Sequence, residues 1–214
     1  MKIEIGKERP EYFKEAYPGE LDGASHFGCA AVIPEVLSLI TTFKENGKPN
    51  ATFYSGTSFA GDAGGQFIII PYPETGGGHI YTNIMRDKVF CVNYLSSKYY
   101  GACIKTIENN GDEDDEVEAG GFTSELCTMI KAPRVKESII SLECTFTSTY
   151  TLPGHNRALI LIGEVQYAHI EPGYHMPDKI CGADGFMYNI NSAQDLSGGE
   201  RMPWGAAYLK HFDI

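Results

Sequence analysis

A strand–turn–strand pattern between residues 36 and 55 constrains the fold of this chain more than any other feature. Residues 36–43 are apolar and β-branched enough to form a buried strand. Glu45-Asn46-Gly47 is a hairpin turn signal, because Asn and Gly tolerate the positive φ of tight turns. Residues 50–55 then carry small and hydroxyl-bearing side chains. Small residues on a strand let a flat ligand approach the backbone, so the hairpin predicts a ligand platform.

The rest of the pattern is also rich in strands. Further strands are predicted at residues 66–71, 89–93, 139–151 and 158–169, with short helices at 81–87 and 96–107. The chain has 214 residues, of which 43% are hydrophobic, enough to fill a sizeable core. Short strands with few helices predict a mainly β fold that closes into a barrel, because closure removes exposed strand edges.

Charge and composition exclude several classes of partner. Lys and Arg total 17 against 28 Asp and Glu, so the formal charge is -11. No basic surface is available to neutralise phosphates, which argues against a nucleic-acid or membrane partner. The N-terminus lacks an apolar leader and no apolar run is long enough to span a bilayer, so we expect a cytoplasmic protein. The six scattered cysteines predict free thiols and no zinc or disulfide framework.

No constellation of catalytic side chains stands out, so catalytic residues stay unknown. The sequence lacks a nucleophile elbow, a phosphate-binding loop and a zinc-binding His-Glu-x-x-His helix. Asp112, Asp114 and Glu116 alternate in the acidic segment 109–118, but their spacing does not match a calcium loop. We expect a solvated loop there and no metal site. The absence of catalytic side-chain motifs is typical of an enzyme whose cofactor carries out the reaction.

Five sequence blocks occur in the order of a known family. The first is the hairpin itself, and the second is Asn83-Ile84 leading into a Phe-Cys-Val-Asn strand. The others are residues 116–123, the paired segments 131–135 and 141–144, and the Ile-Gly-Glu-Val strand within 159–165. Together they resemble the flavin reductase-like, FMN-binding split-barrel family, which includes the flavoredoxins.

The resemblance implies a fold and an organisation. The expected fold is mainly β with short helices, a six-stranded Greek-key split β-barrel that forms a homodimer. The barrel domain would span residues 28–172, preceded by an N-terminal arm at 1–27. A C-terminal extension at 173–214 would pack on the barrel or on the dimer partner, because it is too apolar to extend into solvent.

The resemblance also places a flavin, which we expect to be FMN, with FAD as an alternative. The second arm of the hairpin would line the flavin ring, with backbone N–H groups meeting the ring oxygens and N5. These residues are Asn50, Ala51, Thr52 and Ser55, and Thr42 on the facing arm is a weaker candidate. The competing interpretation is that Thr52 and Ser55 are ordinary surface residues of a strand.

The phosphate site departs from the family pattern. The family commonly has an Arg and then a Thr or Ser shortly before the helical Asn, but this chain has Gly78 and Ile80 at those positions. Helix N-terminal amides can hold a phosphate without a cation. The phosphate is therefore expected at the backbone amides of Tyr81, Thr82 and Asn83, assisted by Thr82 or Arg86.

The implied function is an FMN-binding oxidoreductase, either an NAD(P)H-dependent flavin reductase or a flavoredoxin-like electron-transfer protein. NAD(P)H would deliver a hydride to flavin N5, and an acceptor or a redox protein partner would take the electrons. Two alternatives stay open, namely a non-enzymatic electron carrier and a split-barrel binding module that has lost flavin. His155 and His169 are candidates for the nicotinamide side, although surface or capping roles are favoured for both.

Overall fold

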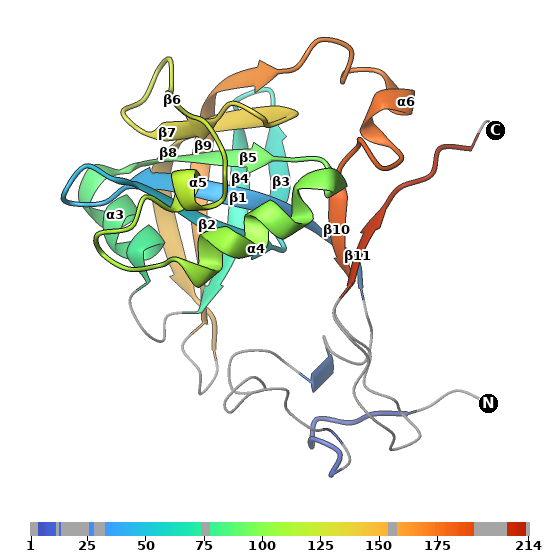
Figure 1. Cartoon of the computed structure of the whole chain (residues 1–214). Helices are drawn as coiled ribbons and strands as arrows, with labels where there is room; N and C mark the ends of the chain where they lie inside the picture. Colours follow the sequence, from blue (N-terminus) through green and yellow to red (C-terminus); the bar gives the residue numbers. More distant parts are fainter. Residues whose placement is uncertain are drawn as a thin grey trace.

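The computed structural model describes residues 4–11, 13, 26–27, 33–73, 78–153, 158–190 and 205–212. It is dominated by a nine-stranded sheet in the order β11-β10-β1-β5-β8-β9-β4-β3, with β2 as a further strand paired to β1 (Figure 1). The strands of this sheet are β1 (Glu35–Phe43), β2 (Pro49–Ser55), β3 (Ser58–Asp62), β4 (Gly65–Pro73), β5 (Val89–Tyr94), β8 (Ile140–Thr151), β9 (Ala158–Ile170), β10 (Met187–Ile190) and β11 (Gly205–Tyr208).

Short helices and one small hairpin complete the described structure. The hairpin joins β6 (Ser124–Leu126) to β7 (Pro133–Val135). The helices are α3 (His79–Asp87), the 3-10 helix η1 (Ser97–Tyr99), α4 (Tyr100–Glu108), α5 (Glu116–Ala119) and α6 (Pro177–Ile180). No helix within the described ranges has the length and apolar character needed to cross a membrane.

The predicted hairpin is confirmed as β1 and β2. The two strands pair antiparallel, with Thr42 opposite Asn50 and Ile40 opposite Thr52. Gly47 has a φ of 84°, a conformation that other residues adopt only with strain, and its N–H donates to the carbonyl of Lys44 at 2.9 Å. The Asn-Gly turn therefore sets the register that places small side chains along β2.

The sheet curves into a barrel whose interior holds the main hydrophobic core, and α3 covers one end of the barrel (Figure 1). Apolar side chains from five strands and from α3 fill this space, and the fully buried ones include Ile40, Ile68, Ile84, Phe90 and Val92. Within the described residues no ladder joins β2 to β4. Stacked tyrosine rings cross that seam instead, from Tyr54 on β2 to Tyr72 on β4 and on to Tyr81 on α3.

A second apolar layer packs outside the barrel. The helices α4 and α5 lie against β2, and residues of β7 and β10 join the same cluster. Its buried members include Leu39, Ala51, Cys103, Val117 and Met187. At the edge of β2, the N–H of Ala51 is taken up by Glu116 of α5.

The mainly β class with short helices is confirmed, but the main sheet has nine strands where six were predicted. The additional strands have a simple origin. β3 folds back on β4 as a hairpin, and β10 pairs with the first residues of β1 and carries β11 beside it. The segment after residue 172 thus contributes strands to the barrel sheet, while the predicted domain boundaries themselves stay predictions. Five described cysteines are free thiols, and Cys29 lies outside the described residues.

Candidate functional site

A buried ion pair joins the hairpin to α5. The ammonium nitrogen of Lys44, directly after β1, lies 2.9 Å from Oε1 of Glu116, and the two side chains are 5% and 1% exposed. Oε2 of Glu116 accepts the backbone N–H of Ala51 at 2.7 Å. With its amide nitrogen turned toward the carboxylate, Asn50 donates to Oε1 at 3.2 Å. The charge of Glu116 is therefore compensated by one cation and two N–H donors.

Backbone groups of the acidic segment surround Lys44. The predicted solvated loop at 109–118 is confirmed for residues 109–114, which are exposed, and is wrong for Glu116 and Val117, which are buried in α5. Lys44 donates to the carbonyl oxygens of Gly111 at 2.6 Å and Asp114 at 2.8 Å. Asp112 is exposed as predicted, but Glu116 is buried within α5. The segment is held against Lys44 by three oxygen atoms, which are the carbonyls of Gly111 and Asp114 and the carboxylate of Glu116. Neither Lys44 nor Glu116 was identified from sequence as a site residue.

His79 extends the cluster to the amino end of α3. Its Nε2 lies 2.8 Å from Oδ1 of Asp112 and its Nδ1 lies 3.0 Å from Oδ1 of Asn110. The same Nδ1 is 3.5 Å from the Glu116 carboxylate. As a half-buried first residue of the helix, His79 links α3 to the acidic segment.

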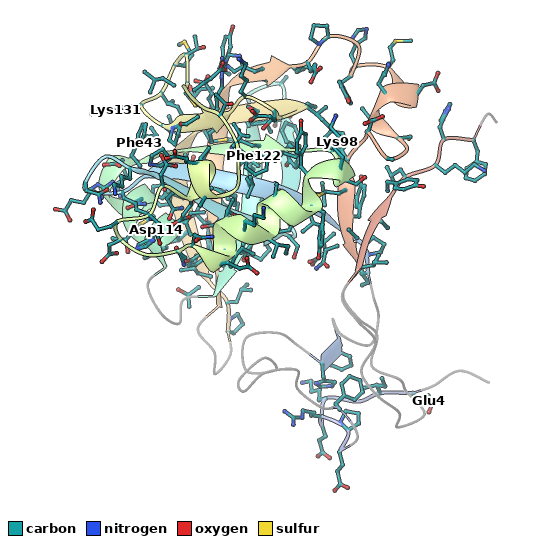
Figure 2. The ribbon with its side chains drawn as sticks, in the orientation of Figure 1. Glu4, Phe43, Lys98, Asp114, Phe122 and Lys131 are labelled. Atoms are coloured by element: carbon teal, nitrogen blue, oxygen red, sulfur yellow. The ribbon has the colours of Figure 1, made fainter. Side chains whose placement is uncertain are left out.

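Two hollows open beside this cluster. The larger measures about 460 Å³ and lies between the hairpin turn, α3 and the acidic segment; its lining is Lys44, Glu45, Asn46, His79, Thr82, Asn83, Arg86, Asp112 and Glu113. The neighbouring hollow of about 430 Å³ shares Lys44, Glu45 and Arg86 and continues to Phe43, Asp87 and Lys131. Figure 2 places Phe43, Asp114 and Lys131 at the same end of the molecule. Both volumes are typical of small-molecule sites, which range over about 300–1,000 Å³.

Three predicted site residues meet where α3 contacts the end of β1. The side-chain amide of Asn83 donates to Oγ1 of Thr42 at 3.0 Å, and both residues are buried. Arg86 donates to Oδ1 of Asn83 at 3.3 Å and to the carbonyl of Phe43 at 2.6 Å. Thr82 is exposed toward the larger hollow. The structure therefore brings Thr42, Asn83 and Arg86 together through direct hydrogen bonds.

The charge of Arg86 is already matched within the protein. Its guanidinium forms an ion pair with Asp87 at 2.6 Å. The hydrogen bond from Arg86 lowers the pKa of the Asp87 carboxyl, so Asp87 stays ionised at neutral pH. An anion that approaches Arg86 also meets the negative charge of Asp87.

The four predicted residues of β2 have different environments. Asn50 and Ala51 are buried against Glu116, whereas Thr52 and Ser55 are half-buried. The hydroxyl of Ser55 donates to Oε2 of Glu35 at 2.9 Å. The N–H of Ala51 points away from β1, toward Glu116. In an antiparallel ladder every second residue points its N–H in the same direction, so the N–H groups of residues 53 and 55 also point away from β1.

The amides predicted to hold a phosphate have partners within α3. The N–H of Tyr81 donates to the carbonyl of Gly78 at 3.1 Å, and the N–H of Thr82 donates to the same carbonyl at 3.4 Å. The N–H of Asn83 lies inside the helix and points to the carbonyl four residues earlier. The ring of Tyr81 stacks on Tyr72, with ring centroids 5.8 Å apart.

A second polar cluster surrounds Glu143 on β8. Its buried carboxylate accepts the N–H groups of Thr128 and Met129, each at 2.7 Å, and lies 2.8 Å from Nε2 of His169. Burial by itself raises the pKa of Glu143, but the two N–H donors and His169 outweigh it and the pKa is lowered. Arg134 contacts His169 and forms an ion pair with a carboxylate of β6. His155, the other histidine candidate, lies outside the described residues.

No cluster of three or more His, Cys, Asp or Glu side chains that could hold a metal ion occurs in the described part of the chain. The polar groups around the two hollows are instead lysine, arginine, histidine and amide side chains together with the carboxylates of Glu45, Asp87, Asp112 and Glu113. Such a donor set suits an organic ligand with hydrogen-bonding oxygens and nitrogens.

Comparison with known proteins identifies the domain. Residues 30–183 match the sequence profile of the Flavin reductase like domain. A curated protein of Aquifex aeolicus is 37% identical over 62 residues, which are 29% of this chain and 32% of the length of that protein. The chain thus spans about a third of the curated relative that it matches.

Solved structures share the fold at low sequence identity. A protein with a split barrel domain from Shewanella frigidimarina is 19% identical, with a TM-score of 0.71 over 91% of this chain and 92% of that chain. Nitrilotriacetate monooxygenase component B from Bacillus cereus is 18% identical, with a TM-score of 0.69 over 94% and 98%. Flavoredoxin of Desulfovibrio vulgaris is 15% identical, with a TM-score of 0.62 over 85% and 90%. These similarities confirm the split-barrel fold.

Proposed function

Because the chain belongs to the Flavin reductase like domain family, we propose that it is a flavin-dependent oxidoreductase that takes electrons from NADH or NADPH. The observation that carries this proposal is the family match across residues 30–183, which includes the hairpin, α3 and the acidic segment. Bound flavin would accept a hydride and pass its electrons to an acceptor or to a redox protein partner. FMN is the proposed flavin, with FAD as the alternative.

The edge of β2 fits a flat ring with oxygen and nitrogen acceptors. Thr52 and Ser55 are half-buried with hydroxyl groups, and the outward N–H groups of residues 53 and 55 lie on the same edge. Thr52 and Ser55 would contact the ring. Asn50 and Ala51 would support the strand beneath the ring, because the side-chain amide of Asn50 and the N–H of Ala51 both donate to Glu116.

Thr42 and the residues of α3 would support the ligand at the other end of the site. Thr42 is buried and accepts a hydrogen bond from Asn83, so it would fix the position of α3 and would not touch the ligand. Thr82 and Arg86 line the larger hollow, where they would face the chain attached to the flavin ring.

Flavin reconstitution and anaerobic reduction test this function. Purified protein would be mixed with FMN or FAD, freed of unbound flavin and measured by absorbance, then treated anaerobically with NADH and with NADPH. We expect a bound flavin spectrum and bleaching by at least one nicotinamide. Bound flavin that neither nicotinamide bleaches would favour an electron carrier. Protein that retains no flavin would contradict the proposal and favour a binding module.

The proposed assembly is a homodimer. Large apolar side chains are exposed on the β6–β7 hairpin and at the adjoining end of β9; they are Leu126 at 64%, Met129 at 63% and Ile170 at 53%. Exposed apolar side chains of this size often mark a subunit interface. Multi-angle light scattering would give twice the chain mass, whereas a monomer at every concentration would contradict the proposal.

A further inference from the structure

A tyrosine hydroxyl fills the place where the family's clamp arginine would begin. Gly78 is the N-cap of α3, at the position where the family commonly has Arg. A Cβ atom on Gly78 would lie 2.8 Å from the hydroxyl oxygen of Tyr72, the one described atom within 4 Å outside its chain neighbours and the backbone of α3. Real Cβ atoms do not make contacts that short. A side chain at residue 78 would therefore require the Tyr72 hydroxyl to shift.

Tyr72 cannot swing aside easily, because its ring is held in a stack. The ring centroids of Tyr72 and Tyr54 are 6.4 Å apart with an interplanar angle of 21°, and the rings of Tyr72 and Tyr81 make an angle of 18°. Tyr54 is itself fixed by a hydrogen bond from its hydroxyl to the carbonyl of Pro71. Moving Tyr72 away would break its ring contacts with Tyr54 on β2 and with Tyr81 on α3.

The Tyr72 hydroxyl faces the amino end of α3, where a phosphate would bind. Burial raises the pKa of Tyr72, and the backbone N–H groups of Tyr81 and Gly78 partly oppose that effect. The phenol is therefore neutral at physiological pH and lies against those amides. A phosphate at this helix end would have to displace it.

The remaining parts of a clamp are also missing. Ile80, at the family's hydroxyl position, is 3% exposed and packs in the barrel core. Arg86 is paired with Asp87, and the larger hollow also presents Glu45, Asp112 and Glu113. A phosphate dianion there would meet more negative than positive charge, since Lys44 is already neutralised by Glu116.

We propose that Tyr72 is a specificity-determining residue that makes this site insensitive to the flavin phosphate, so that riboflavin binds as tightly as FMN. The ring and its ribityl chain would supply the affinity, and the phosphate would stay in solvent. This inference rests on the proposed function, because it assumes that the site binds a flavin. It differs from the sequence-based prediction of a phosphate contact at residues 81–83.

The first measurement compares riboflavin and FMN on the native protein. Dissociation constants would be measured by quenching of flavin fluorescence at low and high salt. We expect the two constants to agree within about threefold, less than one charge-assisted hydrogen bond would give, and to be unaffected by salt. FMN binding more than about tenfold tighter than riboflavin would overturn the inference while leaving the proposed function intact. Binding of neither flavin would overturn both.

Paired variants then test the role of Tyr72. Because a Cβ atom at residue 78 would collide with the Tyr72 hydroxyl, Tyr72→Phe should relieve that collision in the Gly78→Arg variant. The double variant is expected to prefer FMN over riboflavin by about tenfold or more, as a new charge-assisted contact would give. Gly78→Arg alone should lower the melting temperature and show no such preference. Tyr54→Phe, which alters the other end of the ring stack, is the control. The ratio of its riboflavin and FMN dissociation constants should stay near one.

Two outcomes would overturn the role of Tyr72. One is an FMN preference in Gly78→Arg alone as large as in the double variant. The other is a double variant with native-like circular dichroism that still binds riboflavin and FMN equally. Should the double variant fail to fold, Arg86→Ala in the native background decides the matter. An unchanged ratio of the FMN and riboflavin constants supports the inference, and a selective loss of FMN affinity assigns the phosphate to Arg86.

Discussion

Lys44 and Glu116 form a buried ion pair, with 2.9 Å between the ammonium nitrogen and the carboxylate, at the point where the hairpin meets α5. The pair organises the end of the barrel, because Lys44 also gathers the carbonyls of the acidic segment and Glu116 also binds the N–H of Ala51. The shape of both hollows depends on these contacts, since Lys44 lines each of them.

Lys44→Met should lower the free energy of unfolding by about 3–5 kcal/mol, because it leaves the Glu116 carboxylate buried without its cation. Urea denaturation would measure the change. The matched control is Lys48→Met, whose ion pair with Glu113 is exposed and should contribute less than about 1 kcal/mol. Equal effects of the two substitutions would contradict a structural role for the buried pair.

Ala51→Leu should destabilise the protein by about 1–3 kcal/mol, because the added atoms enter a packed cluster between β2 and α5. Flavin affinity should fall as well, since the outer edge of β2 would be displaced. Ala60→Leu is the control: Ala60 is exposed on β3, so a change below about 0.5 kcal/mol is expected. A fully stable Ala51→Leu variant would show that the cluster has room at this position.

Gly163→Ala should destabilise the barrel, because a Cβ atom there would overlap the ring of Phe90, with Cε1 at 2.6 Å. Thermal and urea unfolding should show a loss of about 1–3 kcal/mol, the usual cost of overpacking a core. Gly101→Ala is expected to have the opposite sign. That glycine lies in α4 with open space around it, and alanine in a helix is favoured over glycine by about 0.5–1 kcal/mol.

Glu143 should make the stability of the protein depend on acid pH. Its pKa is lower in the folded protein than its ordinary value of 4.5, so its stabilisation is complete above that value and is lost as pH falls toward the lowered pKa. Glu143→Gln should cost about 1–3 kcal/mol at neutral pH through weaker hydrogen bonds from Thr128 and Met129. The difference between variant and native protein should shrink below pH 4.5. A difference that stays constant with pH would argue against this linkage.

Local features of the chain could be predicted from the sequence. The alternation of apolar residues, the Asn-Gly turn and the short apolar runs identified β1, β2, β4, β5, β8 and β9 as well as α3 and α4. These elements depend on backbone preferences and side-chain periodicity over a few neighbouring residues, which are present in the sequence itself. The additional strands β10 and β11 could not be predicted, because β10 forms by pairing with the distant β1 and β11 forms by pairing with β10.

The candidate site was only partly predictable for the same reason. The sequence pointed to α3 and β2, and it showed that Gly78 and Ile80 replace the family's clamp residues. It did not show that Glu116 is buried, because a carboxylate in an acidic segment is normally solvated until a distant lysine reaches it.

By itself, then, the sequence determined most of the strands and helices of the barrel and that Gly78 stands where the family resemblance places an arginine. Only the tertiary structure decided what lies at that position, since the hydroxyl of Tyr72 on β4 reaches Gly78 at the start of α3. The physical reason is that secondary structure follows from local backbone preferences, whereas a site depends on which side chains long-range packing brings within a few ångströms of each other.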